Sequence, residues 1–315
     1  MLCLFACNNG TSKGISNQSK ELKIERFEQE LLDTPSADLQ SHLVQLRGQY
    51  NSKCLNIYPE DPAFMDMVAG FRQDSTIQFI YSCINKEYRN LDWLEKELSR
   101  ALDRTEALDE SIHIDKVFTM LNGSFDYSNR VYCEGNEVVI SIDQYVLPDM
   151  ECYRYFDMPM YLVNLCKKEY ILPDCIAAIV RNHVALPEEP LTMLDYMIME
   201  GKTLYLVNEV LPKVADTLKI RYTKDQLDWM QTNEKNVWSY FMQGKLLYET
   251  DYRSIQNFIS EAPKTNAFKD SAPRTAIYIG WQIVEQYMKR NKVTISELMA
   301  NTDSQSILQN SGYRP

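Results

Sequence analysis

Several signatures of common enzyme and membrane-protein classes are missing from this sequence. The 315 residues include only 10 glycines and 12 prolines, which argues against a β-sandwich rich in tight turns. No G-x-x-x-x-G-K-S/T or G-x-G-x-x-G stretch is present, so no nucleotide-binding loop is predicted. The G-x-S-x-G turn of serine hydrolases is missing as well. No apolar run reaches about 18 residues, so no segment is predicted to cross a membrane.

The charge balance excludes nucleic acid as a partner. Lysine and arginine number 33 against 44 aspartates and glutamates, so the formal net charge is -11. Such an acidic surface repels a phosphate backbone. The hydrophobic content of 45% and the mean hydropathy of -0.38 are ordinary for a globular chain. At this length the chain can bury a substantial core in one or two domains.

The histidines of this chain do not form the motif of an ordinary zinc hydrolase. The chain has three histidines, His42, His113 and His183, and no H-E-x-x-H stretch. A catalytic zinc site needs three protein ligands and an open position. We therefore predict no bound metal, no cofactor and no catalytic residue set.

The eight cysteines include no C-x-x-C pair. Six of them follow the first seven residues at wide, irregular spacings, which argues against zinc held by cysteine. Buried free thiols are one interpretation, because free cysteine is commonly buried. In an oxidising compartment a disulfide is the other, and the sequence does not assign its connectivity.

The first residues resemble the lipidation signal of a bacterial lipoprotein. In Leu4-Phe5-Ala6-Cys7, a bulky aliphatic residue stands three positions before a cysteine and a small residue directly before it. The small residue lets a peptidase reach the bond, and the Cys7 thiol carries the lipid. Six residues before the cysteine are short for a signal peptide, so a chance apolar N-terminus of a cytoplasmic protein is the alternative. We predict a leader and flexible tether over residues 1–20.

Hydrophobic periodicity divides the remaining chain into two helical parts around a small sheet. Helical spacing runs through residues 21–110, and strand signals gather in 114–143, where residues 134–136 predict a hairpin turn. Helical spacing resumes over 150–312. The expected fold class is α+β, mostly helical, with three or four strands and one domain over 21–315. The helices are expected at about 36–48, 61–72, 75–88, 91–104, 159–168, 173–183, 191–210, 224–231, 234–247, 251–259, 274–290 and 294–300.

The helix expected over 191–210 carries a carboxylate on its apolar face. Met197 and Leu204 lie on the same side of this helix as Glu200. Because a buried carboxylate is costly unless it is paired, hydrogen-bonded or metal-bound, Glu200 is either an ion-pair partner of a neighbouring helix or a functional group. His183, on the apolar face of the preceding helix, is either a hydrogen-bonded core residue or a ligand.

Four stretches of the chain resemble one protein family. They read MLDYMIMEGK at 193–202, IGWQIVEQYM at 279–288, IERF at 24–27 and IDQY at 142–145. All are similar to the gliding-motility lipoprotein B family of Bacteroidota. The resemblance implies a lipid-anchored protein of the cell envelope, associated with gliding motility and type IX secretion, whose partners are other envelope proteins.

That family in turn resembles zincin-like zinc peptidases, in which H-E-x-x-H lies on one helix and a glutamate on the next helix is the third ligand. Glu200 matches the third-ligand position. With His183 as the second histidine, Ile179 and Val180 stand where the first histidine and the catalytic glutamate would be. The resemblance therefore implies a zincin-like fold in which Glu200 and His183 are relics of a lost metal site.

The favoured hypothesis is a lipid-anchored, non-enzymatic envelope protein that acts through protein–protein contacts. Its only attachment to the membrane is expected to be the lipid on Cys7. The alternative is an envelope hydrolase, metal-dependent or unconventional, with its site around Glu200. The metal content of the protein separates the two hypotheses.

Overall fold

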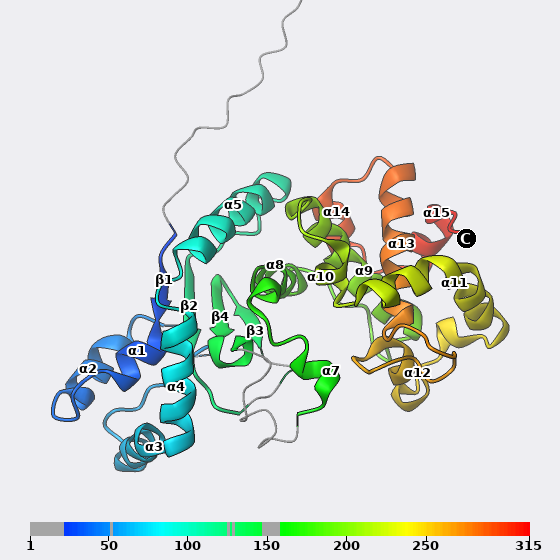
Figure 1. Cartoon of the computed structure of the whole chain (residues 1–315). Coiled ribbons are helices and arrows are strands. Elements are labelled where there is room, and N and C mark those ends of the chain that lie inside the picture. The colour runs from blue at the N-terminus through cyan, green and yellow to red at the C-terminus, as the bar shows by residue number, and fades with distance from the viewer. Residues whose placement is uncertain (1–21, 51–52, 125–126, 128–129, 147–157) are drawn as a thin grey trace, which may run out of the picture.

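The computed structural model describes residues 22–50, 53–124, 127, 130–146 and 158–315. The predicted lipidation site Cys7 and the cysteine Cys152 lie outside these residues. Within them the fold is mostly helical with one small sheet, which confirms the predicted fold class (Figure 1). The zincin-like relationship stays a prediction.

The sheet joins strands from two distant parts of the chain. Strand β1 (Ile24–Arg26) pairs in parallel with β2 (Lys116–Met120), which pairs in parallel with β4 (Glu137–Ser141). At the other edge, β3 (Val131–Glu134) is antiparallel to β4. Gly135 forms the turn of this hairpin at φ 56°, a left-handed conformation that glycine adopts without strain. The hairpin is as predicted, and the first strand joins the sheet from the start of the described chain.

Alternation along the strands buries both faces of the sheet. Phe118 and Val139 belong to a small core on one face, whereas Val117, Val138 and Ile140 belong to the main core on the other. Such two-sided burial is typical of parallel strands. The small core is covered by α1 (Phe27–Leu32), α2 (Leu39–Arg47) and α3 (Pro62–Gln73). The main core takes side chains from α4 (Ser75–Glu87), α5 (Asp92–Leu108) and α8 (Ile171–Arg181).

The second half of the chain is a group of helices that α8 separates from the sheet (Figure 1). Its long helices are α9 (Met193–Val210), α11 (Lys224–Gln243) and α13 (Thr275–Arg290). The shorter helices are α7 (Met160–Val163), α10 (Asp216–Ile220), α12 (Tyr252–Ile259), α14 (Ile295–Ala300) and α15 (Ser304–Ser311). Single 3-10 turns are η2 (Ile142–Tyr145), η3 (Lys168–Tyr170) and η4 (Leu246–Tyr248).

Helix α9 begins and packs as its sequence dictates. The Thr192 hydroxyl accepts a hydrogen bond from the Asp195 N–H at 3.2 Å, and the Asp195 carboxylate accepts one from the Thr192 N–H at 2.8 Å. This reciprocal cap satisfies two backbone donors at the helix start. It sets the register in which Glu200 faces the neighbouring helices.

Helices α9 and α13 cross at two glycines. A Cβ atom on Gly201 would lie 2.4 Å from the Gly280 carbonyl oxygen, and one on Gly280 would lie 1.9 Å from the Met197 carbonyl oxygen. No side chain tolerates such an approach to backbone, so both positions require glycine. Because Gly201 follows Glu200 directly, the crossing also holds that carboxylate in place.

Some helix predictions were wrong. Helix α11 is continuous, although a break was predicted near residues 231–234, because Met230, Val237 and Phe241 bury one face throughout. Helix α7 is a single turn rather than the predicted 159–168, and α10 and α15 were not predicted. Among the described residues, the cysteines Cys54, Cys83, Cys133 and Cys175 are thiols rather than members of a disulfide.

Candidate functional site: a network of arginines and carboxylates

The site begins at a carboxylate that interrupts an apolar helix. Asp174 lies in the first turn of α8 and is buried. Its Oδ2 accepts hydrogen bonds from Arg130 Nη2 and from the Tyr145 hydroxyl, each at 2.7 Å, and its Oδ1 accepts one from Arg221 Nη2 at 2.6 Å. Burial raises the pKa of Asp174, but the two guanidinium groups outweigh burial and hold the pKa below its usual value. Asp174 is therefore ionised and fixed in position.

Two arginines of the network occupy left-handed backbone conformations. Arg221 follows α10 at φ 61°, and Arg274 precedes α13 at φ 47°. Non-glycine residues adopt this region uncommonly, so the surroundings must hold them there. Both guanidinium groups meet Glu261, whose Oε1 lies 3.3 Å from Arg221 Nη1 and 3.2 Å from Arg274 Nη1. Arg274 Nη1 also donates to the Ile220 carbonyl oxygen at 3.1 Å, which ties the two bends together.

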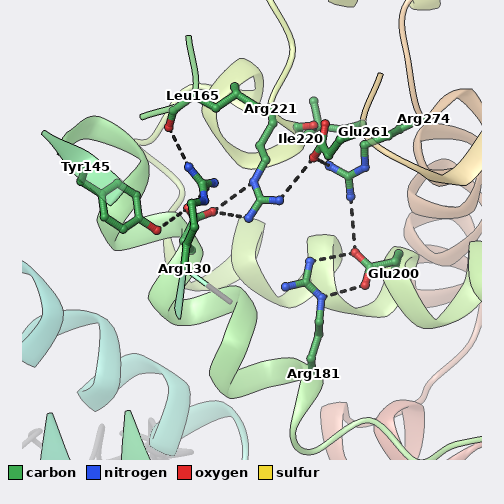
Figure 2. A network of polar contacts seen from close by, with 10 residues as sticks. Arg130, Tyr145, Leu165, Arg181, Glu200, Ile220, Arg221, Glu261 and Arg274 are labelled. Carbon is green, nitrogen blue, oxygen red and sulfur yellow. Dashed lines mark hydrogen bonds and ion pairs between the residues drawn. The ribbon is translucent and has the colours of Figure 1, made fainter. Parts of the chain in front are cut away.

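Glu200 forms the other end of the network (Figure 2). Its Oε1 accepts a hydrogen bond from Arg181 Nε at 2.7 Å, and its Oε2 accepts one from Arg181 Nη2 at 2.9 Å. Arg274 Nη2 lies 3.5 Å from Oε2. Burial raises the pKa of Glu200, but Arg181 and Arg274 outweigh it and lower the pKa to about 2. The bidentate pair fixes the carboxylate plane as well as its position.

These contacts make one continuous chain of ion pairs through four arginines and three carboxylates. Its members come from the start of the β3 hairpin, from α8 and α9, and from three loops that flank the C-terminal helices. In order along the chain of contacts they are Arg130, Asp174, Arg221, Glu261, Arg274, Glu200 and Arg181. Arginine suits this role because its planar fork donates to several carboxylate oxygens at once.

Glu200 and His183, the two residues predicted to be relics of a metal site, have different contact partners in the structure. Glu200 belongs to the network, with 24% of its side chain exposed. His183 lies just after α8, where its Nδ1 is 2.8 Å from the Ile179 carbonyl oxygen. Among the described residues no hydrogen bond or ion pair joins His183 to Glu200. His42 and His113 pair with acidic side chains elsewhere.

The contacts of Glu200 bear directly on metal binding. A metal ligand directs a free lone pair at the ion, whereas here both carboxylate oxygens accept from Arg181 and one of them also faces Arg274. Two neighbouring positive charges also repel a dication. In the part of the chain that the structure describes, no three His, Cys, Asp or Glu side chains are grouped so as to hold an ion. The relic interpretation of Glu200 and His183 stays a prediction.

Sequence reasoning missed most of the network. The four arginines and Glu261 lie in separate segments, and only tertiary structure brings them together. One signal was available: Asp174 stands in the apolar run Ile171–Val180, as Glu200 stands in the apolar face of its own helix. A carboxylate inside an apolar helix predicts a buried cation nearby.

A second buried carboxylate lies at the sheet. Asp143 follows β4 in η2 and is fully buried. Its Oδ2 accepts a hydrogen bond from the Gly123 N–H at 3.1 Å, while its Oδ1 has no hydrogen-bond partner among the described residues. Burial raises the pKa of Asp143 to about 7 despite the backbone donors. This carboxyl group therefore changes charge near neutral pH.

A cavity of about 400 Å³ opens beside the network. Its lining includes Arg221 and Glu261 of the network together with Tyr161, Tyr170 and Pro263. This is the range of volumes in which small ligands and peptide side chains bind.

These features define a mostly helical α+β protein with a network of ion pairs between arginines and carboxylates around Asp174 and Glu200. The chain matches the family described as gliding motility protein GldB over residues 8–315, so it belongs to that family. The stretches that suggested the family supply Glu200, the glycines of the helix crossing, and Tyr145 of the network. No curated protein and no solved structure matches the chain. Within the described ranges, no helix is both long and apolar enough to cross a membrane.

Proposed function

We propose that this gliding-motility-related protein is anchored to a membrane by a lipid on Cys7 and acts by binding other envelope proteins rather than by catalysis. The lipobox-like Leu4-Phe5-Ala6-Cys7 supports the anchor. Membership of a gliding-motility family supports a place in the cell envelope.

The contacts of Glu200 support a non-catalytic role. An acid, base or metal ligand must be able to exchange its partners during a reaction. Glu200 is held by a bidentate arginine and has a pKa of about 2, so near neutral pH it remains ionised and occupied. Its partner Arg181 is a structural counter-ion in this interpretation. A hydrolase at Glu200 would need Arg181 to move away first.

The observation that carries the protein-binding role is a group of exposed tyrosines on the C-terminal helices. Tyr240, Tyr248 and Tyr252 lie at the end of α11, in η4 and at the start of α12, and expose 43%, 56% and 50% of their surfaces. Met242, between them in sequence, is exposed as well. Tyrosine and methionine are enriched at protein interfaces, and tyrosine buries a large area there with little loss of conformational freedom. We call these four exposed residues, which lie close together in sequence, the tyrosine patch.

Site-specific photo-cross-linking in the native host tests the patch. A photoreactive phenylalanine at Tyr248 or Tyr252 should give a discrete, light-dependent adduct with another envelope protein. Tyr58 is the matched control, because it is equally exposed but lies before α3, away from the patch. Equal adducts from Tyr58 and Tyr248, or no adduct from either patch position, would contradict the proposal.

Fractionation tests the anchor independently. In the full chain with its native leader, Cys7→Ser should move the protein from the membrane to the soluble fraction. The parent should carry the lipid mass on its N-terminal peptide. Unchanged membrane retention of the variant, with no lipid mass in the parent, would contradict anchoring through Cys7.

A further inference from the structure

The cavity beside the network lies next to an excess of buried positive charge. Arg130, Arg221 and Arg274 are 2%, 16% and 6% exposed, and between them they share Asp174 and Glu261. Glu200 also pairs with Arg274, at 3.5 Å, but its bidentate partner is the more exposed Arg181. Over the whole network, four guanidinium groups face three carboxylates, and the three arginines of the inner group are the most buried of the four. An uncompensated buried charge is unfavourable.

Positive charge continues from this inner group to the cavity mouth. Arg221 contributes to the cavity lining, and so does the exposed Lys167. Glu261 contributes the opposing charge, but its Oε1 is shared by two arginines. The start of the 20-residue helix α11 also borders the cavity, and a helix start carries partial positive charge. In a chain of net charge -11, the lining of this cavity has two cationic side chains against one carboxylate.

We propose that the cavity binds a carboxylate side chain carried by an extended segment of a partner protein. The carboxylate pairs with Lys167 and faces Arg221, which compensates the excess charge of the inner group. Tyr161, Tyr170 and Pro263 provide apolar wall area for the residues on either side of the acid. These walls favour a peptide over a bare inorganic anion. The inference deepens the proposed function, because it names a second contact site and the chemistry of its ligand.

Peptide titration tests the site on the full chain with Cys7→Ser. The probes are two fluorescent, end-blocked peptides, Ala-Phe-Glu-Phe-Ala and Ala-Phe-Gln-Phe-Ala, which differ only in the central charge. The Glu peptide should bind about tenfold more tightly, as for a charge-assisted contact, and added salt should weaken it. Lys167→Gln should weaken the Glu peptide about threefold or more without changing the Gln peptide. Lys213→Gln, an exposed lysine outside the cavity, is the matched control and should have no effect.

Three results would overturn the inference. Equal affinity of the two peptides would remove the carboxylate as the recognised group. Equal effects of Lys167→Gln and Lys213→Gln would remove the cavity as the site. Binding of inorganic phosphate that depends on Lys167, without binding of the Glu peptide, would assign the cavity to a phosphate group instead. None of these depends on the tyrosine patch, so loss of Tyr248 adducts with intact peptide binding would contradict only the proposed function.

Discussion

Two buried aspartates, one in the helical half and one at the sheet, have opposite charge behaviour. Asp174 is 5% exposed and Asp143 is fully buried, so burial alone would raise both pKa values. Asp174 meets Arg130 and Arg221, and its pKa is lowered. Asp143 meets backbone donors, one of its oxygens has no partner among the residues that the structure describes, and its pKa rises to about 7. The nearby cations, rather than the depth of burial, decide which carboxylate remains charged.

Buried polar groups also differ between the two halves of the molecule in how fully their burial is compensated. In the helical half, arginines and carboxylates pair with one another and connect segments that are distant in sequence. At the carboxyl end of the parallel strands, the burial of Asp143 is incompletely compensated. The first arrangement is suited to rigidity, and the second makes stability depend on pH near neutrality.

The largest effect is expected from removing Asp174. Asp174→Ala leaves two arginines buried without their shared counter-charge, which should lower the free energy of unfolding by about 3–5 kcal/mol. Asp174→Asn should also destabilise, because an amide does not replace the negative charge. Chemical denaturation at neutral pH measures both. A loss below about 1 kcal/mol for Asp174→Ala would show that the network contributes little to stability.

The second largest loss of stability is expected from a substitution at the crossing of α9 and α13. Gly280→Ala forces a Cβ into the α9 backbone and should cost about 3 kcal/mol, because neither backbone can move without repacking the core. Gly70→Ala in α3 is the control: nothing lies within 4 Å of its Cβ, so it should be neutral or stabilise by up to about 1 kcal/mol. Melting curves of the two variants compare a tight site with an open one. Equal melting temperatures would mean that α9 is not fixed by the crossing.

Removing the charge of Asp143 should change the stability of the protein in the opposite direction to removing the charge of Asp174. Its folded pKa is raised from 3.8 to about 7, so its contribution to stability is full at low pH and is lost as pH rises through 7. Asp143→Asn removes the charge, so it should stabilise the protein by about 2 kcal/mol above neutral pH and have a smaller effect in mild acid. Denaturation at several pH values measures this. A destabilised variant above neutral pH would mean that Asp143 has a cationic partner.

A smaller effect is expected at Glu200, because its side chain is partly exposed. Glu200→Ala should cost about 2 kcal/mol and Glu200→Gln less, since the amide keeps one acceptor for Arg181. The folded pKa is lowered from 4.5 to about 2, so this stabilisation is present above about 4.5 and is lost as pH falls toward 2. The difference in the free energy of unfolding between Glu200→Gln and the parent should therefore become smaller over that acid range. A gap that stays constant with pH would show that the ion pair does not stabilise the fold.

Helices and strands could be predicted from the sequence where neighbouring residues in the chain determine them. The helix over 191–210 was predicted by its apolar spacing, and it is the structure's α9, starting at the Thr192 cap. The β3–β4 hairpin followed from the turn residues around Gly135. By contrast, α11 was predicted as two helices with a break near residues 231–234, whereas burial of Met230 and Val237 on either side keeps the helix continuous. Helix α15 was not predicted, because its sequence is mostly polar and its apolar pattern is weak.

The candidate site was predictable only in part. Glu200 could be singled out, because a carboxylate in an apolar helix face requires a partner. The partner itself could not be identified, since Arg181, Arg274 and Arg221 carry no local pattern that distinguishes them from surface arginines. The left-handed backbone conformations of Arg221 and Arg274 are a product of the tertiary contacts. The network is therefore a property of the folded chain rather than of any one segment.

Arginines hold Glu200, and zinc-dependent thermal stability tests most directly the prediction that this carboxylate binds no metal. The melting temperature of the full chain is measured with excess zinc and with chelator, for the parent and for Glu200→Ala. We predict that the parent melts at the same temperature in both conditions and that Glu200→Ala melts lower in both by the same amount. A parent that zinc stabilises and chelator destabilises, with the difference lost in Glu200→Ala, would contradict the account and favour a metal-dependent hydrolase.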